Sequence, residues 1–189
     1  MDSLTQIVLG IATAELVAGK KLQNKTFLYG AMLGTIPDLD IVVGKFLSDV
    51  EGVAIHRGLS HSFLFFVFLS PALGFLISKI EKNKISFKSA SLLSLSCLVT
   101  HVLLDVFTSW GTQILWPLDY RFALKTIFVI DPLYTIPLLI SLIFVWKNKD
   151  SLIRRKFVIR GLIISSSYLL ITCIFILFSV HKFEKALQY

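Results

Sequence analysis

Residues Ser89–Trp110 read SASLLSLSCLVTHVLLDVFTSW, and a single formal charge, that of Asp105, interrupts this apolar run. A hydrocarbon core of about 30 Å requires about 20 apolar residues at about 1.5 Å each, which this segment provides. Three further segments meet or nearly meet that length: Ser62–Ile80, Ile127–Trp146 and Phe157–Val180. The sequence therefore predicts an all-α, polytopic transmembrane helical bundle with four firm spans.

Two apolar segments near the N-terminus, Leu4–Ala18 and Phe27–Pro37, are too short for ordinary spans. We expect a partly buried N-terminal hairpin or two tilted, shallow helices rather than ordinary spans, and leave open whether these two segments cross the membrane. Gly30 and Gly34 form a small-xxx-small face, which favours close helix packing over lipid exposure. Simple tolerance of glycine is the alternative explanation.

The composition excludes an ordinary soluble domain, since 55% of the residues are hydrophobic and the mean hydropathy is +0.77. No Pro/Gly/Ser-rich linker or fixed repeat divides the chain, so we expect residues 1–189 to form one membrane-embedded helical domain. Cys97 and Cys173 both lie inside apolar runs, which leaves neither a disulfide framework nor a cysteine-rich zinc site.

The net charge of +7 comes from basic residues that lie between the apolar segments rather than along one amphipathic face. This pattern indicates membrane topology and no nucleic-acid partner. If all six segments cross, most lysine and arginine residues fall on one side, and the positive-inside rule makes that side cytoplasmic. The segments 38–60 and 111–126 are then predicted to face the extracytoplasmic side.

His101 and Asp105 stand four residues apart in the segment Ser89–Trp110 and therefore share one helix face. One imidazole and one carboxylate can bind the same ion. An ionisable pair inside a membrane helix is energetically costly, and it usually marks a functional site that faces the bundle interior or a water-filled cavity. The alternative is a His–Asp hydrogen bond that joins helices.

The segment Pro37-Asp38-Leu39-Asp40 places two carboxylates on either side of a leucine, directly after a helix-stopping proline. In extended geometry Asp38 and Asp40 would face the same way. Zn²⁺, Mn²⁺ and Mg²⁺ all accept carboxylate oxygens. A solvated turn is the alternative to a metal site.

The segment His56-Arg57-Gly58-Leu59-Ser60-His61-Ser62 lies where the chain enters the next apolar run. Ser60 or Ser62 can cap the helix, and Arg57 can bind a phosphate or carboxylate bidentately. We assign His61 to a metal and His56 to a ligand or general acid/base role. A surface loop with incidental histidines is the alternative.

Two more polar residues belong to the same predicted side. Asp131 precedes Pro132 and could be a further ligand, a partner that orients a histidine, or a helix N-cap. Arg121 could bind an anionic head group or pair with Asp119. Cap and orienting roles are favoured over direct ligation for Asp131.

Five elements together carry a resemblance to a known family. They are Met1-Asp2-Ser3-Leu4-Thr5, Pro37-Asp38-Leu39-Asp40, His56-Arg57-Gly58-Leu59-Ser60-His61-Ser62, His101-x-x-x-Asp105 and Trp116-Pro117. Up to about Asp131 the chain resembles the YdjM-like family, bacterial inner (plasma) membrane proteins that are predicted to be metal-dependent hydrolases.

The resemblance implies a set of metal-binding positions and a reaction centre. The implied ligands are Asp38, Asp40, His61, His101 and Asp105, with His56 and Arg57 as the implied catalytic residues. Many members carry a histidine where this chain has Gln6, which could instead supply an amide oxygen or hold a metal-bound water. The family is also similar to zinc-dependent phospholipases C, so the implied cofactor is one to three divalent ions, zinc first and manganese or magnesium otherwise.

The first functional hypothesis is a membrane-bound metal-dependent hydrolase, phospholipase C-like or phosphatase-like. Membrane lipids are its predicted partners, and a phosphoester or ester of a lipid or other amphiphile is its predicted substrate. The alternative is a non-catalytic metal-binding membrane protein, such as a sensor, an ion pathway or a stress-related structural factor. A His-Glu-x-x-His metalloprotease motif and a Gly-x-Ser-x-Gly elbow are both missing from the sequence. The oligomeric state is left open.

Overall fold

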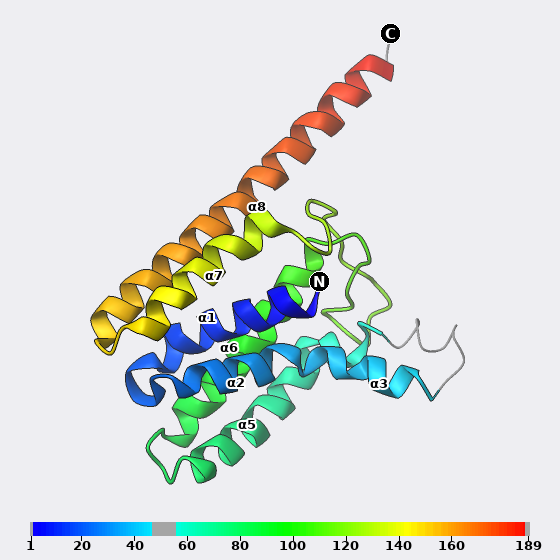
Figure 1. The fold of residues 1–189 in the computed structure, drawn as a ribbon. Helices are drawn as coiled ribbons and strands as arrows, with labels where there is room; N and C mark the ends of the chain where they lie inside the picture. The colour runs from blue at the N-terminus through cyan, green and yellow to red at the C-terminus, as the bar shows by residue number, and fades with distance from the viewer. Residues whose placement is uncertain (1, 47–55, 188–189) are drawn as a thin grey trace.

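The computed structural model describes residues 2–46 and 56–187, and every regular element in those ranges is a helix (Figure 1). The longer helices are α1 (Ser3–Leu22), α2 (Lys25–Thr35), α5 (Phe63–Ile80), α6 (Phe87–Val106), α7 (Pro132–Lys147) and α8 (Ser151–Leu187). The short ones are η1 (Pro37–Leu39), α3 (Asp40–Gly44) and η2 (Leu59–His61). Residues 47–55 of the predicted outer segment 38–60 lie outside the described ranges.

Helix α1 occupies the centre of the bundle, where it contacts α2, α6, α7 and α8. It begins at an aspartate N-cap, because the Asp2 carboxylate accepts a hydrogen bond from Thr5 N at 3.0 Å. One face of α1 packs with α7 and α8 around side chains such as Ala12, Leu138 and Val158, all fully buried. Helix α1 therefore joins four of the five other long helices, and α5 packs on α6 instead.

Helices α1 and α2 form the predicted hairpin, and glycines set how closely they approach. A Cβ added at Gly34 would lie 2.6 Å from the backbone oxygen of Gln6, and one at Gly30 would lie 2.5 Å from Ile11 Cα. A side chain at either position would therefore push the two backbones apart. The close packing predicted from the small-xxx-small face is confirmed.

Among the described residues, three helices, α5, α6 and α8, are by length and composition apolar enough to cross a membrane. Helix α7 is apolar but has 16 residues, which gives it a length of about 24 Å. The predicted segments are therefore found as helices, but with different ends. The helix expected over Ser89–Trp110 ends at Val106, and the one expected over Ile127–Trp146 begins at Pro132.

The early end of α6 has a local cause. Leu124 N donates to Val106 O at 2.7 Å and Thr126 N donates to Phe107 O at 2.9 Å, so a returning loop takes the last carbonyls of the helix. The loop thus packs across the end of α6. Trp110, which belonged to the predicted span, lies in this loop instead.

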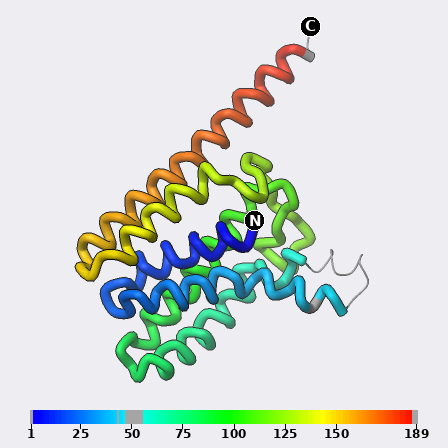
Figure 2. Tube along the Cα trace, viewed as in Figure 1, coloured from blue at the N-terminus to red at the C-terminus, as the bar shows by residue number. Residues whose placement is uncertain are grey.

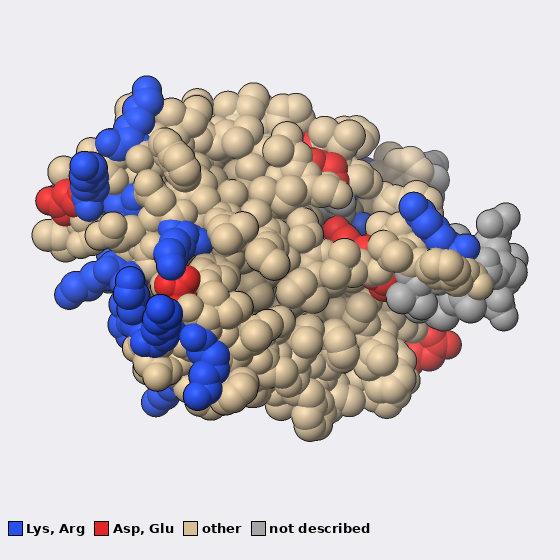
Figure 3. All heavy atoms as spheres, turned by 60° about the horizontal axis from the view of Figure 1, so that its bottom comes forward, with Lys and Arg blue, Asp and Glu red and all other residues tan. Residues whose placement is uncertain are grey.

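The two ends of the bundle differ in charge. Figure 3 shows lysine and arginine side chains gathered at one end, where α1 turns into α2, α5 into α6 and α7 into α8. The opposite end holds the N-terminus, η1, η2 and the loop between α6 and α7 (Figure 1). Helix α8 continues beyond that end (Figure 2). The segregation of charge matches the pattern on which the topology was predicted.

Candidate metal centre

Four side chains from three parts of the chain meet at the end of the bundle opposite the lysines. They are Asp38 of η1, His61 of η2, and His101 and Asp105 of α6. One donor atom from each lies within 4.8 Å of the donor atoms of the others. Three of the four residues are buried, and Asp38 is the partly exposed one. The residue spacing of the sequence did not require these segments to meet, and the fold brings them together.

Each histidine Nε2 lies at a similar distance from the other three donor atoms. His61 Nε2 lies 3.4 Å from Asp38 Oδ1 and 3.5 Å from Asp105 Oδ2. His101 Nε2 lies 3.5 Å and 3.6 Å from the same two oxygens, and the two Nε2 atoms are 3.4 Å apart. Zinc with tetrahedral ligands at about 2.0 to 2.2 Å holds its donors about 3.3 to 3.6 Å from one another. Five of the six separations therefore match those around a tetrahedral ion, and the sixth, between the Asp38 and Asp105 oxygens, is within 4.8 Å.

Both histidines are oriented through their other ring nitrogen. His101 Nδ1 lies 2.7 Å from Gly34 O, and since a carbonyl only accepts, Nδ1 carries the proton and Nε2 faces the cluster. His61 Nδ1 lies 3.0 Å from Ser60 Oγ and 3.4 Å from Asp40 Oδ2. Ligating histidines characteristically use this arrangement, with the second nitrogen held by a carbonyl or carboxylate.

Asp40 lies beside the cluster rather than within the group of four. Its Oδ1 lies 2.9 Å from His56 Nδ1, and its Oδ2 accepts hydrogen bonds from Ser60 Oγ at 2.6 Å and Arg57 N at 3.1 Å. Together with the contact to His61, these bonds use both carboxylate oxygens. The structure therefore gives Asp40 the position of a residue that orients histidines.

The two residues implied as catalytic lie next to the cluster. His56 is held on Asp40, and its side chain is 32% exposed. Arg57 is buried: one terminal nitrogen lies 3.6 Å from Asp105 Oδ1, another donates to Thr108 Oγ1 at 3.1 Å, and Nε has no hydrogen-bond partner among the described residues. Arg57 also has a φ of 63°, a conformation that costs energy for a residue with a side chain. The strained turn directs the guanidinium inward.

Gln6 reaches the same cluster from α1. Its amide nitrogen donates to Asp105 Oδ1 at 3.0 Å and to His101 O at 3.2 Å. The amide oxygen is buried and has no hydrogen-bond partner among the described residues. A buried acceptor without a partner is costly, and a bound ion or its water would satisfy it. The arrangement accommodates the amide-oxygen and water-holding roles expected for Gln6.

The remaining predicted residues have other contacts. Ser62 caps α5, because its Oγ accepts from Phe65 N at 3.2 Å. Asp131 caps α7 through Leu133 N at 3.1 Å and accepts a hydrogen bond from Tyr168 at 2.9 Å, which joins α7 to α8. Arg121 donates to His56 O at 3.2 Å. These residues support the elements around the cluster.

Burial and hydrogen bonding oppose each other in the electrostatics of the site. Burial would raise the pKa of Asp38, but hydrogen bonds with the His101 and His61 rings outweigh it and hold that pKa well below its usual range. Asp40 follows the same pattern, with His56 as its first hydrogen-bond partner. Burial would lower the pKa of His61, but the surrounding carboxylates, Asp105 first, raise it to about 10. These shifts favour negatively charged carboxylates around a positively charged His61 ring.

Three contributors to the site were not recognised in the sequence in these roles. Gly34 supplies a carbonyl, Thr108 a hydroxyl for Arg57, and Ser60 a hydroxyl that links Asp40 to His61. A backbone carbonyl has no sequence signal. Thr108 could have been found from its spacing, since it lies three residues after Asp105. In the structure its hydroxyl donates to the Asp105 carbonyl at 2.7 Å.

Comparison with known proteins places the chain in a family. A family model described as "YdjM inner membrane protein" matches residues 1–179, so the chain belongs to that family. It is 30% identical over 146 residues to "Uncharacterized protein YfhP" of Bacillus subtilis (strain 168), an alignment that covers 70% of this chain and 42% of the relative. The chain thus spans less than half the length of that relative. No solved structure matches.

Proposed function

We propose that this inner membrane protein of the YdjM family is a metal-dependent hydrolase whose ion is held by Asp38, His61, His101 and Asp105. The observation that carries the proposal is the convergence of the four donor atoms, with five of their separations between 3.4 and 3.6 Å. Two imidazoles and two carboxylates form a borderline donor set that suits zinc first, with manganese as an alternative. The outward hydrogen bonds of both histidines add support.

A bound divalent ion would supply Lewis acidity and a water of lowered pKa. The protein's own groups would do the rest. His56, held on Asp40 and partly exposed, is placed to pass a proton to a leaving group. Arg57 would stabilise negative charge that develops on the substrate, using a guanidinium whose Nε is still free of partners among the described residues.

The surroundings of the site favour an amphiphilic substrate. Asp38 and His56 form its more exposed side, whereas the other three ligands are buried. Exposed apolar side chains flank that side, notably Leu39, Ile41 and Leu59. A lipid or similar molecule could rest its chains on these residues and present a phosphoester or ester to the cluster. The charge asymmetry supports an extracytoplasmic location for this end.

One observation favours a non-catalytic alternative, such as a metal sensor or a structural metal site. Four protein donors can close the coordination of zinc, whereas catalytic zinc usually keeps one position for water. Against this, a purely structural ion needs neither Arg57 nor His56 beside it. We therefore keep hydrolysis as the proposal, and the experiment below distinguishes it from non-catalytic metal binding.

The test begins with metal content and continues with turnover. Detergent-purified protein should carry close to one transition-metal ion per chain and should hydrolyse at least one member of a panel of phospholipids and phosphoesters. Asp38→Asn should abolish both, whereas His56→Gln should keep the metal and lose turnover. His181→Ala, an exposed histidine near the end of α8, is the matched control and should change neither.

Each outcome discriminates between the proposals. Metal binding with no turnover by any panel member supports the non-catalytic alternative. Turnover that survives both His61→Ala and Asp105→Ala excludes the proposed mechanism. Metal-free wild-type protein whose stability is unchanged by a chelator contradicts both functions.

A further inference from the structure

Helix α8 extends well beyond the helices that pack against it (Figure 1). Its residues 161–180 include no Asp, Glu, Lys or Arg, and at about 1.5 Å each they span about 30 Å, the thickness of a hydrocarbon core. Two hydrogen bonds fix where α7 begins along this run. Ser165 Oγ donates to Tyr134 O at 2.8 Å. Tyr168 Oη donates to Asp131 Oδ2 at 2.9 Å. The start of α7 therefore lies level with the first half of the apolar run.

The second half of the run, Leu169–Val180, is largely uncovered by protein. Leu169 is buried, and the residues that follow it are partly or fully exposed. At about 1.5 Å per residue, this half extends about 18 Å along α8 beyond the start of α7, and still about 14 Å along the membrane normal at a helix tilt of about 40°. Apolar side chains that no protein covers are stable in hydrocarbon. The hydrocarbon core should therefore continue past the start of α7.

The metal centre lies near the same level as the start of α7. Thr135, in the first turn of α7, has its Oγ1 2.7 Å from Thr5 Oγ1, in the first turn of α1. The next residue of α1, Gln6, donates to Asp105 Oδ1 at 3.0 Å. The ligands are thus close to the level that α8 places inside the hydrocarbon.

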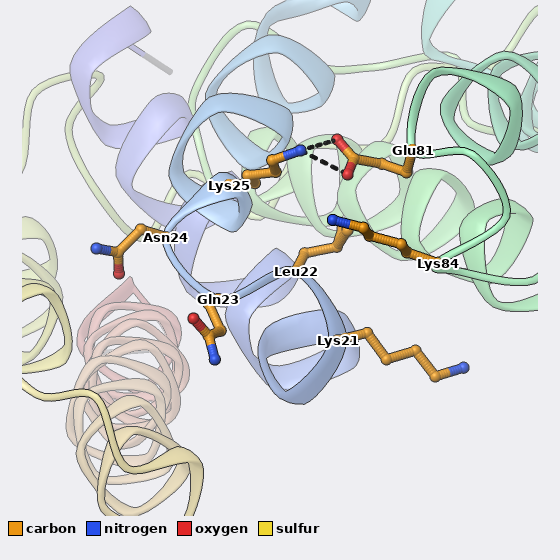
Figure 4. Close-up of a pocket in the computed structure, with 7 residues that line it drawn as sticks. All are labelled: Lys21, Leu22, Gln23, Asn24, Lys25, Glu81 and Lys84. Carbon is orange, nitrogen blue, oxygen red and sulfur yellow. Dashed lines mark hydrogen bonds and ion pairs between the residues drawn. The ribbon is translucent and has the colours of Figure 1, made fainter.

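The distance from the basic end of the bundle leads to the same depth. Figure 4 shows part of that end, where the Lys25 amine meets the Glu81 carboxylate at 2.6 and 2.8 Å. Helix α6 starts at this end with Phe87. At about 1.5 Å per residue, His101 lies about 21 Å and Asp105 about 27 Å along α6 from its start. Both distances are shorter than a core of about 30 Å.

The α6–α7 loop, at the metal-centre end, has a surface that suits hydrocarbon better than water. Its exposed large apolar and aromatic side chains include those of Trp110, Leu118, Tyr120, Leu124, Phe128 and Ile130. The segment formed by η1, α3 and the residues just after α3 exposes Leu39, Ile41, Val42 and Phe46 at the same end. Apolar surface on this scale usually marks a place where a protein meets another molecule or a membrane.

The backbone of the loop is extensively hydrogen-bonded within the protein. The N–H groups that donate to backbone carbonyls belong to Thr112, Gln113, Trp116, Leu118, Tyr120, Phe122, Leu124, Thr126 and Ile127. Irregular backbone is tolerated at membrane depth only where its polar groups have partners other than lipid. The loop therefore has the internal hydrogen bonding that a water-poor environment demands.

Charged side chains set how deep the loop can lie. Asp119, Arg121 and Lys125 are all exposed. Asp119 accepts a hydrogen bond from Gln113 Nε2 at 3.0 Å, and Arg121 donates to His56 O at 3.2 Å. Long basic side chains below the head groups can extend to them while their stems stay in apolar surroundings. These residues favour a position in the outer leaflet, near the head groups, over one at the bilayer centre.

We propose that the outer leaflet of the bilayer covers the α6–α7 loop and the segment from η1 to Phe46, whose apolar side chains lie among the acyl chains below the head groups. The metal centre, with Asp38 and His56 on its more exposed side, then opens towards the leaflet rather than towards bulk water. Its substrate would be a lipid that arrives sideways within the leaflet, a step that rests on the proposed hydrolysis. The position of the loop depends on neither metal nor turnover.

Tryptophan fluorescence measures the position of the loop. The protein is reconstituted into vesicles of phosphatidylcholine and phosphatidylglycerol with bromine on the acyl chains, and iodide is the quencher in water. Trp116→Phe/Trp146→Phe leaves Trp110 as the single tryptophan. Phe128→Trp, in a background with phenylalanine at the three natural tryptophan positions, reports a second exposed point of the loop. Lys185→Trp in that background is the control, since it lies beyond the apolar run of α8.

We expect both loop probes to lose most of their fluorescence to brominated lipid and little to iodide. Lys185→Trp should show the reverse. Bromine placed near the head groups should quench the loop probes at least as strongly as bromine near the chain ends, because the charged residues of the loop keep it close to the head groups.

Two outcomes would overturn the proposal. Loop probes that iodide quenches as strongly as it quenches Lys185→Trp would place the loop in water. Loop probes that neither quencher reaches would assign the cover to protein, such as a second copy of the chain. Adding His101→Ala to the Trp110 protein separates this proposal from the proposed function, because a metal-free variant should keep the lipid quenching of its parent.

Discussion

Two groups of charged residues are buried at different depths of the bundle, and they use their charges in opposite ways. Arg154 of α8 is 1% exposed and binds Glu15 of α1 through two parallel hydrogen bonds of 2.8 and 2.7 Å. Its other terminal nitrogen donates to Asn24 Oδ1 at 2.6 Å and to two carbonyls. Glu15 receives a further bond from Thr26 at 2.6 Å. Every charged nitrogen and oxygen of this pair has a hydrogen-bond partner within the protein.

The metal centre lacks such closure. Two carboxylates and two imidazoles converge there, the Arg57 guanidinium lies 3.6 Å from Asp105, and the Gln6 amide oxygen has no hydrogen-bond partner among the described residues. A buried ion pair whose groups are all hydrogen-bonded is stable without a bound ligand. Several acceptor atoms buried close together are costly unless a cation binds between them. The contrast separates a structural ion pair from a candidate site on geometry alone.

The largest expected effect removes the ion. His101→Ala should reduce the bound metal from about one ion per chain to a background level, because the variant loses one donor and frees the Gly34 carbonyl at once. Metal analysis after gel filtration measures this directly. A folded His101→Ala protein that keeps its metal would contradict the claim that this cluster binds the ion.

Glu15→Ala should destabilise the protein by about 3 to 5 kcal/mol, because it leaves the buried guanidinium of Arg154 without its carboxylate. Unfolding in a denaturing detergent measures the loss. The double variant Glu15→Leu/Arg154→Met should recover most of it, since no unpaired charge remains. In the folded fraction of both variants the metal content should match wild type, and selective metal loss would contradict the separation of the two groups.

Asp40→Asn should weaken metal binding by about 10- to 100-fold without abolishing it, because Asp40 orients His61 and His56 from outside the four donors. A competition titration with a chromophoric chelator gives the ratio of affinities. Asp38→Asn, measured alongside, should be far more severe. Equal losses in the two variants would make Asp40 a direct ligand.

Tyr168→Phe should have the smallest effect, about 1 kcal/mol of stability, because it deletes one hydrogen bond to Asp131 and leaves the ring in place. The same unfolding assay as for Glu15→Ala applies. Metal content should not change, since Asp131 caps α7 and its side chain bonds to α7 and α8. Loss of metal in Tyr168→Phe would assign Asp131 to the site.

Much of the fold followed from local patterns in the sequence. The helices expected over four long apolar segments and two short ones are all present, and the Gly30/Gly34 face does bring α1 and α2 into close contact. The ends of the α6 and α7 helices were less predictable. They depend on hydrogen bonds such as Leu124 N to Val106 O, made by a loop distant in sequence.

The candidate site was predictable as a set of residue types but not as an assembly. His101 and Asp105 share a helix face by spacing alone, and the structure keeps both in the cluster. Asp38 lies in the cluster and Asp40 beside it because of η1, a turn that replaces the extended geometry expected there. Contacts between elements, such as Gln6 with Asp105, have no local signal in sequence.

The contact between Gly34 and Gln6 has a consequence for how the protein matures. The Gly34 carbonyl fixes His101, and the Gln6 amide fixes Asp105, so one helix crossing positions ligands on a third helix. During synthesis α1 and α2 emerge well before α6, and the ligand set does not exist until α6 has docked on that hairpin. Capture of the proposed ion by all four residues would therefore be a late event of biogenesis. The metal content of a preparation would count the molecules that have finished folding.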